Sequence, residues 1–268
     1  MPNSPTLDAS VQWKISSGAI RFQEAGYRGT VEDILSSGLA TEVVGLISAG
    51  KEADVFLARL NGAPLVIKVY RLYRTSRRGG GPIKVDNLAW RAAREFELMR
   101  QAWKGGATVP APAKRVENLL AMRYLGGEDG PAPRLVDLAP ADPPAFRSEL
   151  LAATESLLRA GVVHGDLSAY NVLIHEDRPF FIDFSDGMRV DRLGAAPWMR
   201  LQLARETLTR DLEGLRSYFR RFDADFDPAP VIDRWIAGLV ETWELTHGRR
   251  RRPTPAGRPD ETQDPPST

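Results

Sequence analysis

The stretch from residue 162 to residue 187 constrains the fold of this chain more than any other. Two short apolar runs, Val172 to Ile174 and Phe180 to Ile182, flank a polar turn from His175 to Pro179. Short apolar runs bounded by turn residues are typical of β-strands. We therefore expect two adjacent strands here, with the residues just before and just after them brought together.

Three polar residues occupy those flanking positions. Asp166 and Asn171 lie five residues apart in the loop before the first strand, and Asp183 directly follows the second. Phosphoryl transfer suits this set, because one carboxylate can orient the attacking hydroxyl while an amide oxygen and a second carboxylate hold Mg²⁺ on ATP. The alternative is that Asp166 and Asn171 are turn residues and Asp183 a strand-end cap. Any one residue alone would favour that alternative.

The full motif set favours phosphoryl transfer. His164-Gly165-Asp166, then Asn171, then Ile182-Asp183-Phe184 resemble the His-Arg-Asp, Asn and Asp-Phe-Gly motifs of the protein-kinase superfamily. The chain departs from that pattern at two positions. Gly165 replaces the Arg, and Ser185 replaces the Gly.

Composition narrows the alternatives. The 268 residues suffice for one two-lobed domain or two small ones, and a content of 43% hydrophobic and 26% charged residues is ordinary for a globular protein. Lys and Arg total 36 against 35 for Asp and Glu, so the global charge predicts no polyanionic partner. The absence of cysteine excludes disulfides and thiolate metal sites. No apolar run reaches membrane-spanning length, so we expect a cytoplasmic protein without a membrane partner.

The first half of the chain predicts a small antiparallel sheet. Residues 1–29 are expected to form a partly ordered extension, followed by a short helix that starts at an N-cap, Thr30. Strands are predicted over Glu42 to Ile47, Ala53 to Leu60 and Pro64 to Tyr70. Asn61-Gly62 is a strong hairpin signal between the last two.

Lys68 interrupts the third apolar strand, so it either faces solvent or points at a buried anion. A helix predicted from about Asp86 to Trp103 carries a row of apolar residues that includes Glu95. Because an unpaired buried carboxylate is costly, we expect Glu95 to pair with Lys68. The alternative is that Glu95 borders the apolar row and reaches water. Residues 71–84, rich in Arg and Gly, are predicted to be a mobile basic loop.

After one more strand, the rest of the chain is predicted to be mainly helical. A strand from Leu119 to Leu125 ends at Gly126-Gly127, which in a kinase layout is the hinge between the lobes. Met122 would border the adenine pocket and the backbone of residues 123–125 would pair with adenine. The alternative is a plain edge strand, which would have the same residues, so this assignment rests on position. Apolar rows then predict helices around residues 146–157, 201–219 and 232–243. The lobes are thus expected at 30–125 and 126–247, with a disordered basic and Pro-rich tail at 248–268.

Several motifs outside the kinase set carry a closer resemblance. They are Thr30-Val31-Glu32-Asp33-Ile34-Leu35, the run from Ile47 to Phe56 that contains Ser48-Ala49-Gly50-Lys51-Glu52-Ala53, Ile67-Lys68-Val69-Tyr70, Gly130-Pro131-Ala132-Pro133, Asp166-Leu167-Ser168-Ala169-Tyr170-Asn171 and Ile182-Asp183-Phe184-Ser185. With them the chain resembles the RIO family of atypical serine/threonine protein kinases over roughly residues 30–222.

The resemblance implies an α+β fold with two lobes, an antiparallel-sheet N-lobe and a mainly helical C-lobe. It also implies roles for single residues. Lys68 would bind the α- and β-phosphates of ATP, held by Glu95, while Ser48 and Lys51 would line the phosphate loop. The adenine would lie beside Met122 and Leu125.

In the same way, Asp166 would orient the nucleophile, and Asn171 and Asp183 would bind Mg²⁺ or Mn²⁺. The resemblance further implies an ATPase cycle in which Asp183 is itself phosphorylated, and a partner in ribosomal or other RNA–protein assembly. Two other functions remain open. A small-molecule kinase of the aminoglycoside or choline type shares His-Gly-Asp and Ile-Asp-Phe but tends to lack the Lys51-Glu52-Ala53 turn. A pseudokinase would bind nucleotide without turnover. The presence of Lys68, Asp166, Asn171 and Asp183 argues against this function.

Overall fold

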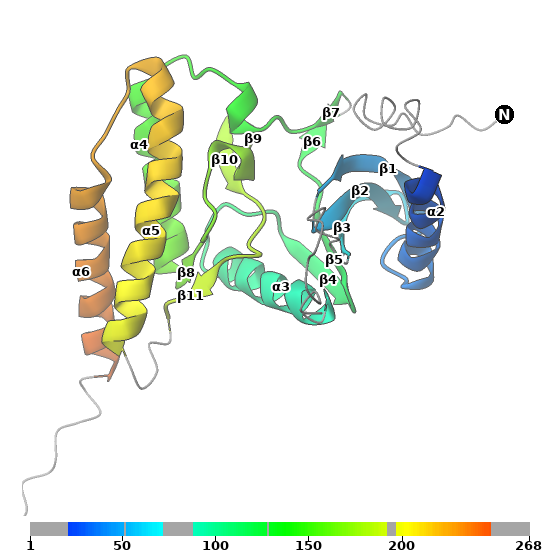
Figure 1. Ribbon diagram of the computed structural model, residues 1–268, viewed down its shortest axis with the longest axis horizontal. Helices are drawn as coiled ribbons and strands as arrows, with labels where there is room; N and C mark the ends of the chain where they lie inside the picture. The colour runs from blue at the N-terminus through cyan, green and yellow to red at the C-terminus, as the bar shows by residue number, and fades with distance from the viewer. Residues whose placement is uncertain (1–20, 51, 72–87, 128, 192–196, 248–268) are drawn as a thin grey trace, which may run out of the picture.

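A computed structural model describes residues 21–50, 52–71, 88–127, 129–191 and 197–247. The predictions made for the N-terminal extension before residue 21, Lys51, the basic loop from residue 72 onward and the tail from residue 248 lie outside these residues. The described chain forms a β-sheet lobe and a helical lobe, which Figure 1 shows side by side. The last strand of the sheet ends at Arg123, and the division between the lobes at residues 125–126 stays a prediction.

The N-lobe sheet has five strands in the order β1-β2-β3-β5-β4, each antiparallel to its neighbours. Its strands are β1 (Glu42–Ala49), β2 (Ala53–Leu60), β3 (Ala63–Tyr70), β4 (Pro112–Val116) and β5 (Leu119–Arg123). The β2–β3 hairpin turns at Asn61 and Gly62, which both have positive φ, 51° and 86°. That is the geometry that an Asn-Gly pair favours, so the predicted hairpin is confirmed.

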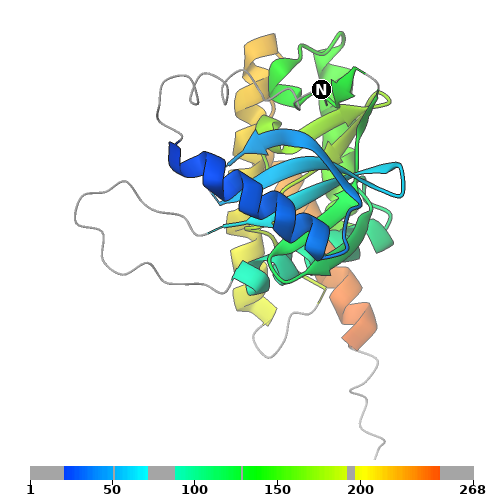
Figure 2. The same ribbon diagram turned by 90° about the vertical axis from the view of Figure 1, so that its right-hand side faces the viewer.

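Two helices cover opposite faces of this sheet (Figures 1 and 2). Side chains alternate along a strand, so Ile67 faces Ile34 of α2 (Arg21–Ser36), while Lys68 faces α3 (Leu88–Lys104). The predicted helix start at Thr30 is wrong, because α2 already begins at Arg21. An N-cap stabilises a helix end by only about 1 kcal/mol, and nothing in the preceding residues interrupts the helix.

The α3 helix buries Ala92, Glu95, Leu98, Met99 and Ala102. Trp103 recurs at the same helical spacing in the sequence but lies outside this buried row, since 48% of it is exposed. With 3.6 residues per turn the buried face passes from Met99 to Ala102, and Trp103 is carried to its edge.

The C-lobe is built on three helices, α4 (Pro143–Arg159), α5 (Pro197–Phe219) and α6 (Pro228–His247), which lie together on the left of Figure 1. Short elements connect them to the sheet. They are β6 (Gly126–Gly127), β7 (Gly130–Pro131), η1 (Leu135–Asp137), β8 (Val162–Val163), η2 (Ala169–Asn171), β9 (Val172–His175), β10 (Arg178–Phe181), β11 (Met188–Arg189) and η3 (Arg220–Phe222).

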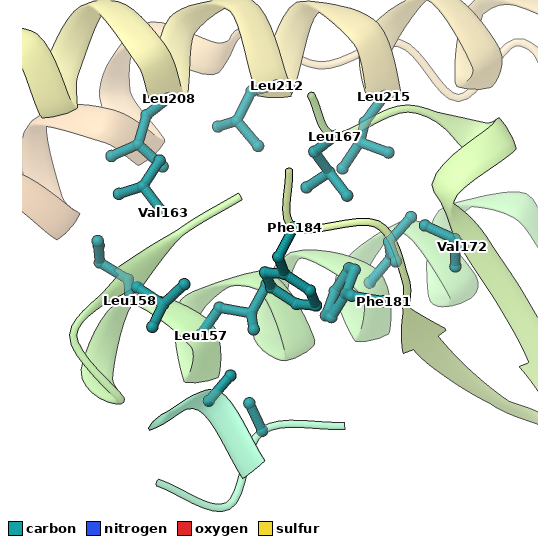
Figure 3. Packing of buried hydrophobic residues seen from close by; sticks show 14 of the residues in the cluster. Leu157, Leu158, Val163, Leu167, Val172, Phe181, Phe184, Leu208, Leu212 and Leu215 are labelled. Atoms are coloured by element: carbon teal, nitrogen blue, oxygen red, sulfur yellow. The ribbon is translucent and has the colours of Figure 1, made fainter. Parts of the chain in front are cut away.

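The β9–β10 pair is the predicted strand pair, but its turn is tighter than expected. His175 pairs with Arg178, so only Glu176 and Asp177 form the turn, and both have positive φ. Pro179 therefore lies in β10 instead of the turn. The pair is anchored by a core in which Phe181 and Phe184 pack between α4 and α5, as Figure 3 shows.

Candidate active site

The centre of the site is Lys68, which is 7% exposed. Its Nζ lies 2.9 Å from Glu95 Oε1 on α3 and 2.9 Å from Asp183 Oδ1 after β10. The predicted Lys68–Glu95 pair is therefore present, and a third residue joins it. Burial alone would lower the pKa of Lys68, but the Glu95 and Asp183 carboxylates outweigh burial and raise it. The amine is consequently held as a cation.

Glu95 is fully buried, yet both of its oxygens have hydrogen-bond donors. Oε1 also accepts from the backbone N–H of Phe184 at 3.1 Å, and the Tyr70 hydroxyl donates to Oε2. Burial, followed by the Glu95 charge, raises the pKa of Tyr70, which keeps the hydroxyl protonated as a donor. Sequence reasoning missed Tyr70, although strand alternation places it on the same face as Lys68, two residues away.

Asp183 has a left-handed backbone, with φ of 66°. Its Oδ1 accepts from Lys68 Nζ and, at 2.8 Å, from the hydroxyl of Ser185. Burial would raise the pKa of Asp183, but the Lys68 cation and these hydrogen bonds lower it to about 2. The carboxylate is therefore ionised at neutral pH, and Ser185, where most kinases have Gly, helps to hold it.

Asp166 and Asn171 lie close together in the loop before β9. The Asn171 side-chain amide donates to the backbone oxygen of Asp166 at 2.8 Å and to its Oδ2 at 3.0 Å. The Asn171 amide nitrogen is therefore engaged by Asp166, and the amide oxygen, which is an acceptor, stays available as a metal ligand.

Asp211 of α5 binds the backbone of this loop. Sequence reasoning also missed this residue. It is 2% exposed, and its two carboxylate oxygens accept from the backbone N–H groups of Gly165 and Leu167, each at 2.9 Å. Burial raises the pKa of Asp211. The signal was available, since Asp211 stands in the apolar row between Leu208 and Leu212 just as Glu95 stands in the row of α3.

His164 completes the support of the loop. Its Nε2 lies 3.0 Å from the backbone oxygen of Ile182, so the ring joins the loop to the end of β10. Burial lowers the pKa of His164. We infer a neutral ring that carries its proton on Nε2 and donates it to that oxygen.

Gly165 stands where most kinases have Arg, and its backbone explains the change. Its φ is 89°, and a Cβ added there would lie 2.3 Å from the backbone oxygen of Asp186. No side chain fits this close approach. The segment after Asp183 therefore closes directly against the catalytic loop.

A cavity of about 1090 Å³ lies between the sheet and the C-lobe. Every site residue predicted from the sequence lines it, apart from Lys51, which lies outside the described residues. These lining residues are Ser48, Lys68, Glu95, Met122, Leu125, Asp166, Asn171 and Asp183. At the predicted hinge, the N–H of Arg123 donates to Ala111 O at 2.8 Å and the carbonyl oxygen of Leu125 accepts from the N–H of Ala132 at 2.9 Å, so the Arg123 carbonyl and the Leu125 N–H are the groups we expect to pair with a ligand.

The oxygen donors in this cavity fit Mg²⁺. Within the described residues no group of three or more His, Cys, Asp or Glu side chains is placed to hold a metal ion. Mg²⁺ typically needs only one or two carboxylates together with substrate phosphates and water, and Asp183 with Asn171 meets that requirement. Among the same residues, no helix is both long and apolar enough to cross a membrane.

A five-stranded sheet lobe, a helical lobe and a Lys–Glu–Asp cluster between them define the protein-kinase-like class of folds. Comparison with known proteins agrees with this class. Two solved structures of the Rio2 kinase from Chaetomium thermophilum share the fold, with TM-scores of 0.59 and 0.58 at 20% and 21% identity. They match 82% and 83% of this chain, and 71% and 77% of the chains compared. One of them is an ADP/Mg²⁺-phosphoaspartate complex.

Sequence comparison identifies the family. The model of the RIO domain matches residues 85–230. The RIO-type serine/threonine-protein kinase Rio1 of Haloferax volcanii is 31% identical over 232 residues, which cover 81% of this chain and 75% of that protein. Rio1 of Methanocaldococcus jannaschii is 32% identical, over 73% of this chain and 69% of that protein. This chain belongs to the RIO family.

Proposed function

We propose that this chain is an ATP- and Mg²⁺-dependent serine/threonine protein kinase of the RIO type. The observation that carries the proposal is the bridge from Lys68 to both Glu95 and Asp183 in a cavity that Asp166 and Asn171 also line. The archaeal Rio1 proteins, which are named serine/threonine-protein kinases, support the same activity. They favour it over a small-molecule kinase.

Each residue has a chemical task in this proposal. Lys68 neutralises charge on the ATP phosphates, and Glu95 with Tyr70 keeps its ammonium in place. Asn171 and Asp183 would hold Mg²⁺, which when bound neutralises charge on the phosphates as the terminal phosphoryl group is transferred. Asp166 accepts a hydrogen bond from the attacking hydroxyl and directs its oxygen toward the phosphorus. Adenine pairs with the backbone of residues 123–125 beside Met122.

The test is the substitution Asp166→Asn, which keeps shape and removes the acceptor charge. We expect phosphoryl transfer to fall by about 100-fold or more, while the ATP dissociation constant measured by calorimetry stays within about twofold. Labelled ATP with the purified protein, both alone and with a generic protein acceptor, provides the activity readout. Near-normal turnover in the variant would remove Asp166 from the mechanism.

The same reaction separates protein phosphorylation from an ATPase cycle. The Chaetomium thermophilum Rio2 complex contains a phosphoaspartate. In this chain we propose Asp183 as the residue that would accept the phosphoryl group. Label that is released by hydroxylamine and maps to Asp183 would identify the ATPase cycle, whereas stable label on Ser or Thr would identify protein kinase activity. A partner in ribosomal or RNA–protein assembly and a cytoplasmic location both stay predictions.

A further inference from the structure

The turn immediately after Asp183 is held by α3. Phe184 is fully buried, and the backbone N–H of Gly187 donates to Phe184 O at 3.1 Å to close the turn. Arg94 reaches this turn from α3. Its Nη2 donates to Gly187 O at 2.7 Å, and its Nη1 lies 3.4 Å from Ser185 O.

Arg94 and its neighbour Glu95 hold the turn by complementary hydrogen bonds. Glu95 accepts from the N–H of Phe184, while Arg94 donates to the carbonyl oxygens on the far side of the same turn. A guanidinium is planar and can direct N–H groups from two of its nitrogens at two neighbouring carbonyl oxygens. The ammonium of lysine is a single nitrogen on a flexible stem and is less suited to this geometry. Two consecutive residues of one helix therefore fix the backbone that carries Asp183.

Trp90 lies one helical turn before Arg94. The guanidinium carbon is 5.7 Å from the centroid of the Trp90 ring, within the range of a cation–π contact. Such a contact restricts the rotamers of a long side chain, which lowers the entropy lost when Arg94 binds the turn. The Trp90 side chain is itself 56% exposed.

The opposite side of the turn lies against the catalytic loop. A Cβ added at Gly187 would lie 3.1 Å from Leu98 Cδ1 and 3.2 Å from His164 O. The turn is thus packed between α3 and the loop that carries Asp166, and Arg94 closes it on the solvent side.

We propose that Arg94, supported by Trp90, is a positioning residue that holds Asp183 ready to bind Mg²⁺. Arg94 binds the neutral backbone carbonyls of Ser185 and Gly187. The turn after Asp183 can therefore be ordered without a phosphate group on it. This inference rests on the proposed function and deepens it, because it assigns the order of the metal site to α3.

The experiment compares Arg94→Ala and Arg94→Lys with Arg100→Ala. Arg100 is a matched control, as it is an exposed arginine on the same helix whose Nη2 contacts Glu97 Oε2 at 2.6 Å. The first readout is hydrogen exchange of the backbone amides in residues 184–190 of the nucleotide-free protein. The second is the Mg²⁺ concentration that gives half-maximal binding of a fluorescent ATP analogue.

In Arg94→Ala we expect both quantities to rise by about tenfold, the effect of losing a charge-assisted hydrogen bond. Affinity for the analogue without Mg²⁺ and exchange in α5 should not change. Arg94→Lys should recover part of the loss, and Arg100→Ala should behave like the parent protein. In turnover, kcat should fall more than KM for ATP rises at saturating Mg²⁺.

Unchanged exchange and an unchanged Mg²⁺ requirement in Arg94→Ala would overturn the proposal. So would a uniform rise in exchange throughout the chain, because that would show general destabilisation. The exchange readout does not involve catalysis. If the parent protein proved inactive, the proposed function would fail while the exchange data still decided whether Arg94 orders the turn.

Discussion

At the scale of single residues, the site is a chain of opposite charges with Lys68 in the middle. One ammonium is shared by a fully buried carboxylate, Glu95, and by the more accessible Asp183. A buried carboxylate without partners would be costly, but Glu95 accepts from Lys68, Tyr70 and the Phe184 N–H. Asp183 is therefore the member of the cluster that can exchange partners when Mg²⁺ and nucleotide bind.

A metal role for Asp183 makes a specific prediction. Asp183→Ala should weaken binding of Mg·ATP by at least about tenfold, because a carboxylate is lost from the cation. Binding of ATP without Mg²⁺ should change little or improve, since the variant also removes a negative charge near the phosphates. Calorimetric titrations with Mg²⁺ and with EDTA measure both quantities. Equal losses in the two titrations would contradict the metal role.

Much of this cluster follows from residue type and spacing alone. Glu95 was found because a carboxylate in an apolar row demands a partner, and Lys68 because a lysine interrupts an apolar strand. Tyr70 and Asp211 escaped for different reasons. A tyrosine gives no such signal in a strand, since its ring suits the core and its hydroxyl finds a partner only in three dimensions. Asp211 did give the signal, but its partners are backbone groups that a sequence does not display.

At the scale of elements, the helices and strands were predictable where periodicity governs them, and less so at their ends. The start of α2 differs from expectation because no residue between Arg21 and Thr30 interrupts the helix, and the β9–β10 turn differs because turn residues permit boundaries one or two residues apart. The close contact between the catalytic loop and the turn after Asp183 was not predictable. It depends on a backbone conformation of Gly165 that brings residues 165 and 186 together.

This contact predicts that Gly165→Ala damages the loop. Gly62 is a matched control, because its φ of 86° is close to the 89° of Gly165 but nothing lies within 4 Å of an added Cβ. Gly62→Ala should lower the free energy of unfolding by about 1 to 2 kcal/mol, the cost of a strained backbone alone. Gly165→Ala should cost more than that and also lower turnover.

Urea unfolding of the two variants measures the difference, and labelled ATP measures turnover. Equal destabilisation with unchanged turnover in Gly165→Ala would contradict the importance of the close approach between residues 165 and 186.

At the scale of the whole molecule, hydrogen bonds from Arg94 and Glu95 of α3 to the turn after Asp183 join the two lobes at the site. Many kinases hold a phosphorylated activation segment with the Arg of His-Arg-Asp; here Gly165 takes its place. Between Asp183 and the start of α5 at Pro197 the chain has only one hydroxyl-bearing residue, Ser185, and no Ala-Pro-Glu motif. Ser185 already donates its hydroxyl to Asp183, so a phosphate there would place like charges together.

We therefore predict that phosphatase treatment leaves ATP turnover unchanged. Control would then come from partner access and product release. Turnover before and after treatment, with mass spectrometry of residues 184–200, provides the measurement. A large loss of activity that follows the loss of phosphate from Ser185 would contradict this prediction.

The protonated state of Lys68 has a consequence for inhibitor chemistry. Acylating and sulfonylating warheads react with the lone pair of a neutral amine, and two carboxylates keep this amine as an ammonium. Such compounds should therefore label Lys68 slowly while both carboxylates are in contact with it. A ligand that displaces Asp183 from Lys68 would remove one of the two charges that maintain the cation, so selective covalent labelling of this chain begins with a group that competes for Asp183.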